Sequence, residues 1–201
     1  FSVNAFANND TYYIFQIDQK IEDEEILCRV EPVYEDAGIY RTSDYSVIRD
    51  FENDNKLIDC ALDSDISLLD LQEDVSTLQN ENWSRAMLGS DYAITKDCTG
   101  RGIRIGLIDS GLIDNFSEIC GATVIPGINL LAAADSDERT DISDSVGHGT
   151  FIASIIASDR VGIAQGAEIV PFKCFDNDRT SLSYIMAAIY AAVDDYNCDV
   201  I

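Results

Sequence analysis

Two short segments carry a carboxylate and an imidazole, side chains that can hold and move a proton. The first, IDSG at residues 108–111, closes a β-branched apolar run over residues 103–108. That run predicts a buried strand, and a carboxylate at the carboxyl end of a parallel strand lies where α/β folds bind ligands. The second, GHGT at residues 147–150, sets the only histidine of the chain between two glycines at a predicted helix start. A lone histidine is ordinarily a core or surface side chain. The flanking glycines, which leave backbone room for a substrate strand, and the upstream carboxylate instead favour a function for Asp109 and His148.

A third segment, VGIAQGA at residues 161–167, is a turn of small residues that leads into an apolar strand. Together the three segments resemble the subtilisin-like serine proteases (peptidase family S8), in the family's order and with near-family spacing. The resemblance covers roughly residues 83–201. It implies a hydrolase of peptide bonds, with a protein or peptide as substrate. Nucleic acid is not expected as a partner, because the chain is strongly acidic.

By this resemblance Asp109 accepts the Nδ1–H of His148, and His148 is the general base and then the general acid. The nucleophilic serine of the triad and the oxyanion asparagine are expected beyond the end of this chain, so the fragment alone is predicted to be inactive. Neither Ser110 nor Ser154 is expected to replace that serine. The alternative is a pseudoprotease that keeps the subtilisin fold as a binding or regulatory scaffold.

The sequence also departs from the family. After GHGT the family usually continues with HVAG, and here residues 151–154 read FIAS. Only two residues separate Ser158 from Val161, so a calcium loop common in the family is expected to be absent. An acidic segment before GHGT could chelate calcium, although a solvated loop is the favoured interpretation, and no metal ligand is assigned. Its acidic residues are Asp135, Asp137, Glu138, Asp141 and Asp144.

Strands and helices are predicted to alternate around these motifs. Strands are expected over residues 103–108, 122–128 and 168–175, with a fourth beginning at 199–201, and helices over 150–158 and after a cap at Thr180 or Ser181. This order predicts an α/β fold: a parallel sheet with helices on both faces, as in an incomplete subtilisin-like domain.

The N-terminal part differs in composition and in the length of its apolar runs. Residues 11–71 are acidic with short apolar runs, which predict a small α+β domain, and residues 72–82 form a polar linker. Residues 1–10 are interpreted as a signal-peptide remnant, 11–78 as an inhibitory and chaperone-like propeptide of a zymogen, and 79–201 as the N-terminal part of the catalytic domain. An ordinary accessory domain is the alternative for the middle segment.

The propeptide interpretation carries two further expectations. Its tail is expected to lie extended beside Arg179, Thr180 and Ser181, which the family resemblance makes candidate substrate-binding residues. Processing is expected within residues 74–79, inside the polar linker.

Composition limits the remaining classes. The formal net charge is −24, with 19 acidic and 5 basic residues in the first 78, which opposes binding to a phosphate backbone. No apolar run is long enough to span a membrane, and AFA at residues 5–7 fits a signal-peptidase site, so the protein is expected to be secreted or at the cell surface. The six cysteines include no C-x-x-C pair, which opposes a zinc site and leaves both free thiols and disulfides of undetermined connectivity open.

Overall fold

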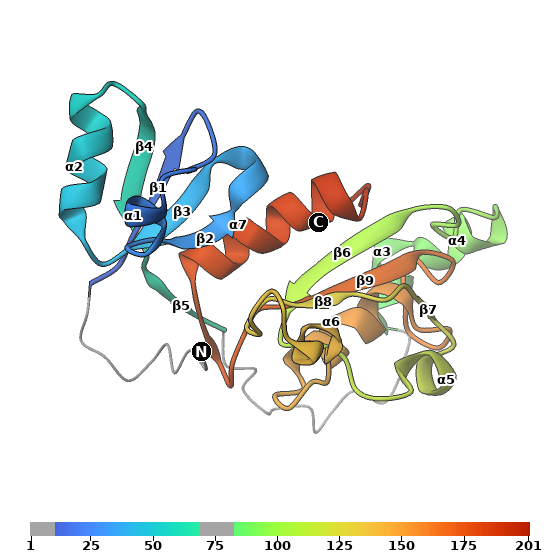
Figure 1. Cartoon of the computed structure of the whole chain (residues 1–201). Coiled ribbons are helices and arrows are strands. Elements are labelled where there is room, and N and C mark those ends of the chain that lie inside the picture. Colours follow the sequence, from blue (N-terminus) through green and yellow to red (C-terminus); the bar gives the residue numbers. More distant parts are fainter. Residues whose placement is uncertain (1–10, 69–82) are drawn as a thin grey trace. The chain divides into compact units, whose positions relative to one another are not determined.

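The computed structural model describes residues 11–68 and 83–201 (Figure 1). The interpreted signal-peptide remnant and the polar linker with its processing site lie outside the described residues. The chain forms two compact units. The first contains residues up to Ile66 together with Thr180–Tyr190, and the second contains Ser67–Arg179 and Ala191–Ile201.

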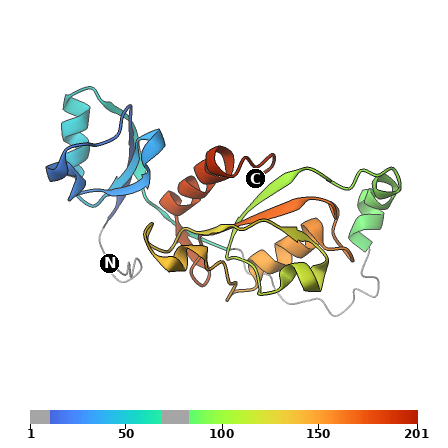
Figure 2. The ribbon, with the colours of Figure 1, turned by 45° about the vertical axis from the view of Figure 1, so that its right-hand side comes forward.

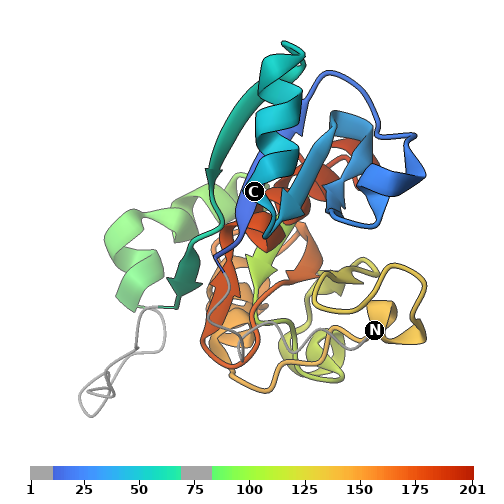
Figure 3. The same cartoon turned by 60° about the vertical axis from the view of Figure 1, so that its left-hand side comes forward.

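The first unit is built on an antiparallel sheet with the strand order β2-β3-β1-β4. Its helix α2 lies along the sheet (Figure 3). Asp44 caps α2 by accepting the Ser46 N–H at 3.0 Å, and the helix buries Val47, Ile48 and Phe51. Its elements are β1 (Tyr13–Ile17), α1 (Glu24–Leu27), β2 (Glu31–Tyr34), η1 (Glu35–Ala37), β3 (Ile39–Thr42), α2 (Tyr45–Asn53) and β4 (Leu57–Leu62).

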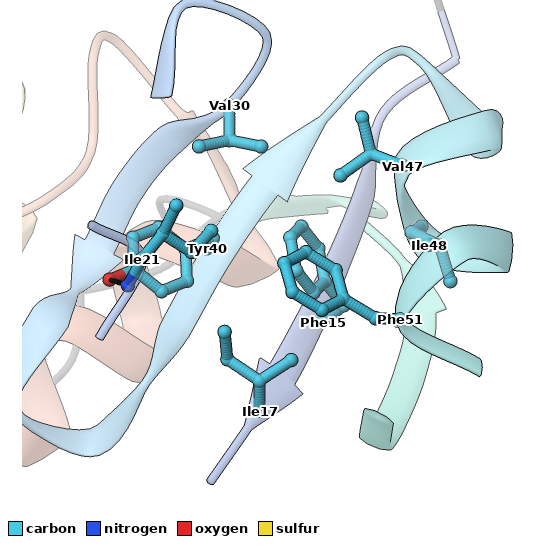
Figure 4. Close-up of a cluster of buried hydrophobic side chains, with 8 residues drawn as sticks. All are labelled: Phe15, Ile17, Ile21, Val30, Tyr40, Val47, Ile48 and Phe51. Carbon is cyan, nitrogen blue, oxygen red and sulfur yellow. Dashed lines mark hydrogen bonds between the residues drawn. The ribbon is translucent and has the colours of Figure 1, made fainter. Parts of the chain in front are cut away.

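Alternation along the strands gives this sheet two apolar faces. Phe15 and Tyr40 point to the α2 side, where they pack with Phe51 (Figure 4). Ile14 and Ile39, at 4% and 0% exposed, belong to the opposite face. There they line a small cavity with residues of helix α7 (Leu182–Tyr190), which comes from a distant part of the sequence. The first unit is therefore a sheet between two helices.

The second unit contains the predicted parallel sheet. Strand β6 (Arg104–Asp109) pairs in parallel with β9 (Glu168–Lys173), side by side in Figure 2. The short strands β7 (Thr123–Val124) and β8 (Ile128–Asn129) also pair with β9. The other elements are α3 (Trp83–Leu88), α4 (Ser90–Thr95), α5 (Phe116–Cys120), η2 (Asp137–Thr140), α6 (His148–Ala157) and the π-helical η3 (Ala191–Asp195).

Both faces of this sheet are covered. Leu107 and Ile169 pack with Ala153 of α6 on one face. On the other, a Cβ added at Gly106 would meet Ala192 of η3 and Cys198 at 3.3 Å. The predicted architecture, a parallel sheet with helices on both faces preceded by a small α+β domain, is confirmed.

Three local predictions differ from the structure. The strand predicted over residues 122–128 is two strands, because Pro126 between them has no N–H for the ladder. Helix α6 begins at His148, two residues before its predicted start. The fourth strand is a single parallel bridge between Ile105 and Val200.

A small separate sheet joins segments far apart in sequence: β5 (Asp65–Ser67) pairs with β10 (Arg179–Ser181). Within the described residues, no helix has the length and apolar character needed to span a bilayer.

Candidate active site

Asp109 is the last residue of β6, and its neighbours hold its backbone firmly. It pairs with Lys173 in the ladder, and its carbonyl accepts the Cys174 N–H at 3.0 Å. The residue is 6% exposed, so its carboxylate is largely withdrawn from water. The Ser110 N–H donates to its Oδ1 at 2.7 Å, which satisfies part of the buried charge.

His148 is the first residue of α6, and the two glycines around it have different physical roles. Gly147 precedes the helix at φ 91°, a left-handed conformation that side chains rarely adopt. A Cβ on Gly149 would lie 2.4 Å from the carbonyl oxygen of Gly111, so glycine allows the helix to approach the loop after β6. Gly111 is itself at φ 111°, with Ile142 O only 2.3 Å from where its Cβ would be. The glycines of IDSG and GHGT therefore let the two segments meet.

The structure brings the two sequence-predicted residues into direct contact. The His148 Nδ1 lies 2.9 Å from both carboxylate oxygens of Asp109. The side chains are 19% and 8% exposed respectively, so the pair is partly open to solvent from the histidine side. A neutral imidazole that donates its Nδ1–H to this carboxylate carries its free lone pair on Nε2. The arrangement can accept a proton at Nε2 and stabilise the resulting imidazolium.

A buried titratable group, Cys174, lies beside the pair. Cys174 is fully buried, and burial, followed by the nearby charge of Asp109, raises the pKa of its thiol far above its usual value. A thiol held in its protonated form is a poor nucleophile. In the described parts of the chain, which contain all six cysteines, every cysteine is free.

The acidic segment before GHGT does not act as one cluster. Asp135, Asp137 and Glu138 are exposed, whereas Asp141 accepts the Ser143 N–H at 3.0 Å. Hydrogen bonds from Ser143 lower the pKa of Asp141. Among the residues with described positions, no three His, Cys, Asp or Glu side chains are grouped to hold a metal ion.

Asp144 differs from the rest of the segment because it faces inward. Burial alone would raise its pKa, but hydrogen bonds from Thr150, Gly147 and Ser110 outweigh that effect and hold the pKa below its usual value. Sequence reasoning weighed this residue only as a calcium ligand. The signal that could have identified it is an aspartate just before a helix start, where carboxylates accept free N–H groups.

The candidate substrate-binding residues Arg179, Thr180 and Ser181 form strand β10. Arg179 is exposed and exchanges backbone hydrogen bonds with Asp176, whereas Thr180 and Ser181 are buried. The Ser181 hydroxyl contacts that of Ser183, and the Ser183 N–H donates to Asp63. Helix α7 was predicted to be capped by Thr180 or Ser181, but Asp63 supplies the cap from a distant part of the sequence.

Known proteins resemble this chain in sequence and in fold. A model described as the subtilase family matches residues 100–201. The alkaline proteinase of Hapsidospora chrysogena is 25% identical over 163 residues, which are 76% of this chain and 39% of that protein.

Two crystal structures resemble the model in fold. One is the epidermin leader peptide processing serine protease of Staphylococcus aureus, with a TM-score of 0.65 and 15% identity over 92% of this chain and 47% of that one. The other is fervidolysin of Fervidobacterium pennivorans, a keratinolytic enzyme related to subtilisin. Its TM-score is 0.65 and its identity 18%, and the match covers 92% of this chain and 34% of that one. The chain thus spans less than half the length of each of these three proteins.

Proposed function

The chain belongs to the subtilase family, and we propose that it supplies Asp109 and His148 to a secreted serine endopeptidase. The nucleophilic serine and the oxyanion donor come from outside these 201 residues. The observation that carries the proposal is the contact between His148 Nδ1 and both oxygens of the buried Asp109 carboxylate at 2.9 Å. A scaffold without catalysis has no need to hold an imidazole in one tautomer.

The chemistry follows from this geometry. Asp109 keeps the proton of the neutral imidazole on Nδ1, so Nε2 takes the proton of the serine hydroxyl as it attacks the peptide carbonyl. The buried carboxylate then stabilises the imidazolium. His148 returns the proton to the leaving amine, and repeats the cycle with water to release the acyl product. Asp109 stays ionised throughout.

We also propose that residues 11–78 are the propeptide of a zymogen. Arg179, Thr180 and Ser181 then belong to the substrate-binding edge of the catalytic domain. Two observations support this. The first unit has its own core around Phe15 and Tyr40. In addition, β5, which follows its last long strand, pairs with β10 by main-chain hydrogen bonds, as an extended peptide pairs with a sheet edge.

The test is self-processing of the full-length protein, purified without other proteases. We expect the wild type to cleave itself within residues 74–79, and His148→Ala to slow cleavage by about 10⁴-fold or more, as loss of a catalytic base does. The exposed Asp135→Asn variant is the control and is expected to process normally. Normal cleavage by His148→Ala would refute the catalytic assignment, whereas a wild type that never cleaves itself would favour a pseudoprotease.

A further inference from the structure

One carboxylate outside the pair collects an unusual number of donors. Asp144 Oδ1 accepts the N–H groups of Val146 and Gly147 at 3.0 and 2.8 Å, and the Ser110 hydroxyl at 2.9 Å. Its Oδ2 accepts the Thr150 N–H at 2.9 Å and the Thr150 hydroxyl at 2.6 Å. Five hydrogen bonds therefore end on one carboxylate, and both of its oxygens are used.

The two hydroxyls around Asp144 join the loop after β6 to the start of α6. Ser110, on the loop side, donates to Asp144 and accepts the Gly149 N–H from the helix at 2.9 Å. Thr150, on the helix side, donates to Asp144 and accepts the Ile113 N–H from the loop at 3.0 Å. Each hydroxyl has one hydrogen, so giving it to Asp144 leaves the lone pairs free for the opposite segment.

These bonds act one residue away from the catalytic pair. Gly149 adjoins His148, and Ser110 adjoins Asp109 and donates its N–H to the Asp109 carboxylate. Ser110 is 1% exposed, so water has little access to replace a lost partner. The relative position of Asp109 and His148 therefore depends on the direction in which two hydroxyls point, the buried one of Ser110 and the half-buried one of Thr150.

We propose that Asp144 is a positioning residue for the proton transfer. It orients the hydroxyls of Ser110 and Thr150, and these hold the start of α6 against the end of β6 so that His148 Nδ1 meets Asp109. The inference rests on the proposed function of that pair. Only a carboxylate serves here, because an asparagine would present an NH₂ group to the donors on one of the two sides.

The test uses the fact that His148 is the only histidine in the chain. In the 201-residue protein labelled with ¹⁵N-histidine, NMR reports one imidazole: its tautomer from the nitrogen shifts, and its Nδ1–H from a downfield proton signal. We expect Asp144→Asn to speed exchange of that proton with water by about tenfold or more, the effect of one lost buried hydrogen bond. A mixed tautomer signal is expected to accompany it.

Matched variants distinguish a positioning role of Asp144 from an effect of its charge and from a loss of folding. Ser110→Ala and Thr150→Val keep every charge and are expected to act in the same direction, whereas Thr150→Ser keeps the hydroxyl and is expected to retain the wild-type signal. Asp135→Asn removes a charge from the same segment and serves as the control. If Asp144→Asn does not fold, the Ser110→Ala spectrum decides.

The outcomes are distinct. Wild-type imidazole signals in Asp144→Asn and Ser110→Ala, even with a lower melting temperature, would show that Asp144 only stabilises the helix and would overturn the proposal. A wild-type signal in Asp109→Asn would instead refute the contact between Asp109 and His148, which is the basis of the proposed function.

Discussion

A single buried aspartate, Asp63, is expected to decide whether helix α7 stays on the sheet of the first unit. Its side chain is 1% exposed. One oxygen accepts the Ser183 N–H and the other the Ser183 hydroxyl, both at 2.8 Å, at the start of α7. The second oxygen also lies 3.3 Å from Nε of Arg41, whose side chain is 10% exposed. Replacing Asp63 by alanine removes the cap and leaves a buried guanidinium without this partner.

The cost follows from those contacts. Loss of a helix cap costs about 0.5–2 kcal/mol. Breaking a buried ion pair costs about 3–5 kcal/mol. Arg41 keeps Glu31 at 3.6 Å and the ring of Tyr12 at 4.2 Å, which offset part of the loss. We therefore expect Asp63→Ala to destabilise the first unit by about 3 kcal/mol, and Asp63→Asn by less because it keeps an acceptor for the Ser183 N–H.

Hydrogen exchange followed residue by residue is the appropriate measurement. A loss of about 3 kcal/mol lowers amide protection in α7 by about 100-fold, and amides of β6 and β9 in the other unit provide the internal reference. The control is Asp54→Asn, which removes only an exposed ion pair with Lys56 and is expected to change protection by less than about threefold. Unchanged α7 protection in Asp63→Ala would refute the reasoning.

Three further experiments test other parts of the chain. Gly149→Ala is expected to lower the melting temperature and displace His148, because its Cβ would lie 2.4 Å from Gly111 O, whereas Ser154→Ala on the same helix has little effect; equal melting curves and histidine spectra would contradict this. Thiol labelling read by mass spectrometry is expected to modify the exposed Cys28 and Cys98 first and Cys174 only after unfolding, since burial raises the Cys174 pKa; comparable native labelling of Cys174 would be the contrary result. Hydrogen bonds from Ser46, then Arg29, lower the pKa of Asp44 from 3.8 to about 2, so its contribution to stability is present above pH 3.8 and lost as the pH falls towards 2. Asp44→Asn is expected to flatten the pH dependence of the melting temperature between pH 5 and pH 2, and an unchanged slope would exclude this role.

Much of the parallel sheet could be predicted because its strands are apolar runs that end in turn residues. The runs before Asp109 and from Glu168 predict β6 and β9 almost to the residue. Local patterns also indicated the helix that carries His148, although its first two residues were missed because glycine and histidine are weak helix formers. His148 and Gly149 begin the helix here because the free N–H groups of its first turn find partners in Ser110 and Asp144.

Contacts between distant segments could not be predicted from periodicity. Helix α7 was assigned to the catalytic part by its place in the sequence, yet it packs with Ile14 and Ile39 of the first unit. Its amphipathic pattern shows that it needs an apolar partner but not which sheet supplies one. The same limit applies to Asp63, which lies 120 positions from the helix that it caps.

The acidity of the chain has a structural use beyond solubility. The first free N–H groups of a helix attract anions, because they are unpaired and the helix dipole is positive at that end. In the described segments, four helices take an aspartate carboxylate at this position: Asp23 for α1, Asp44 for α2, Asp63 for α7 and Asp144 for α6. Asp23 and Asp44 occupy the position directly before their helices. The other two join separate segments, one holding a helix to the first unit and one holding His148 beside Asp109. Hydrogen bonds hold the pKa of Asp144 below its usual value, so its contribution to the candidate active site is present at neutral pH and is lost as the pH falls through that lowered pKa.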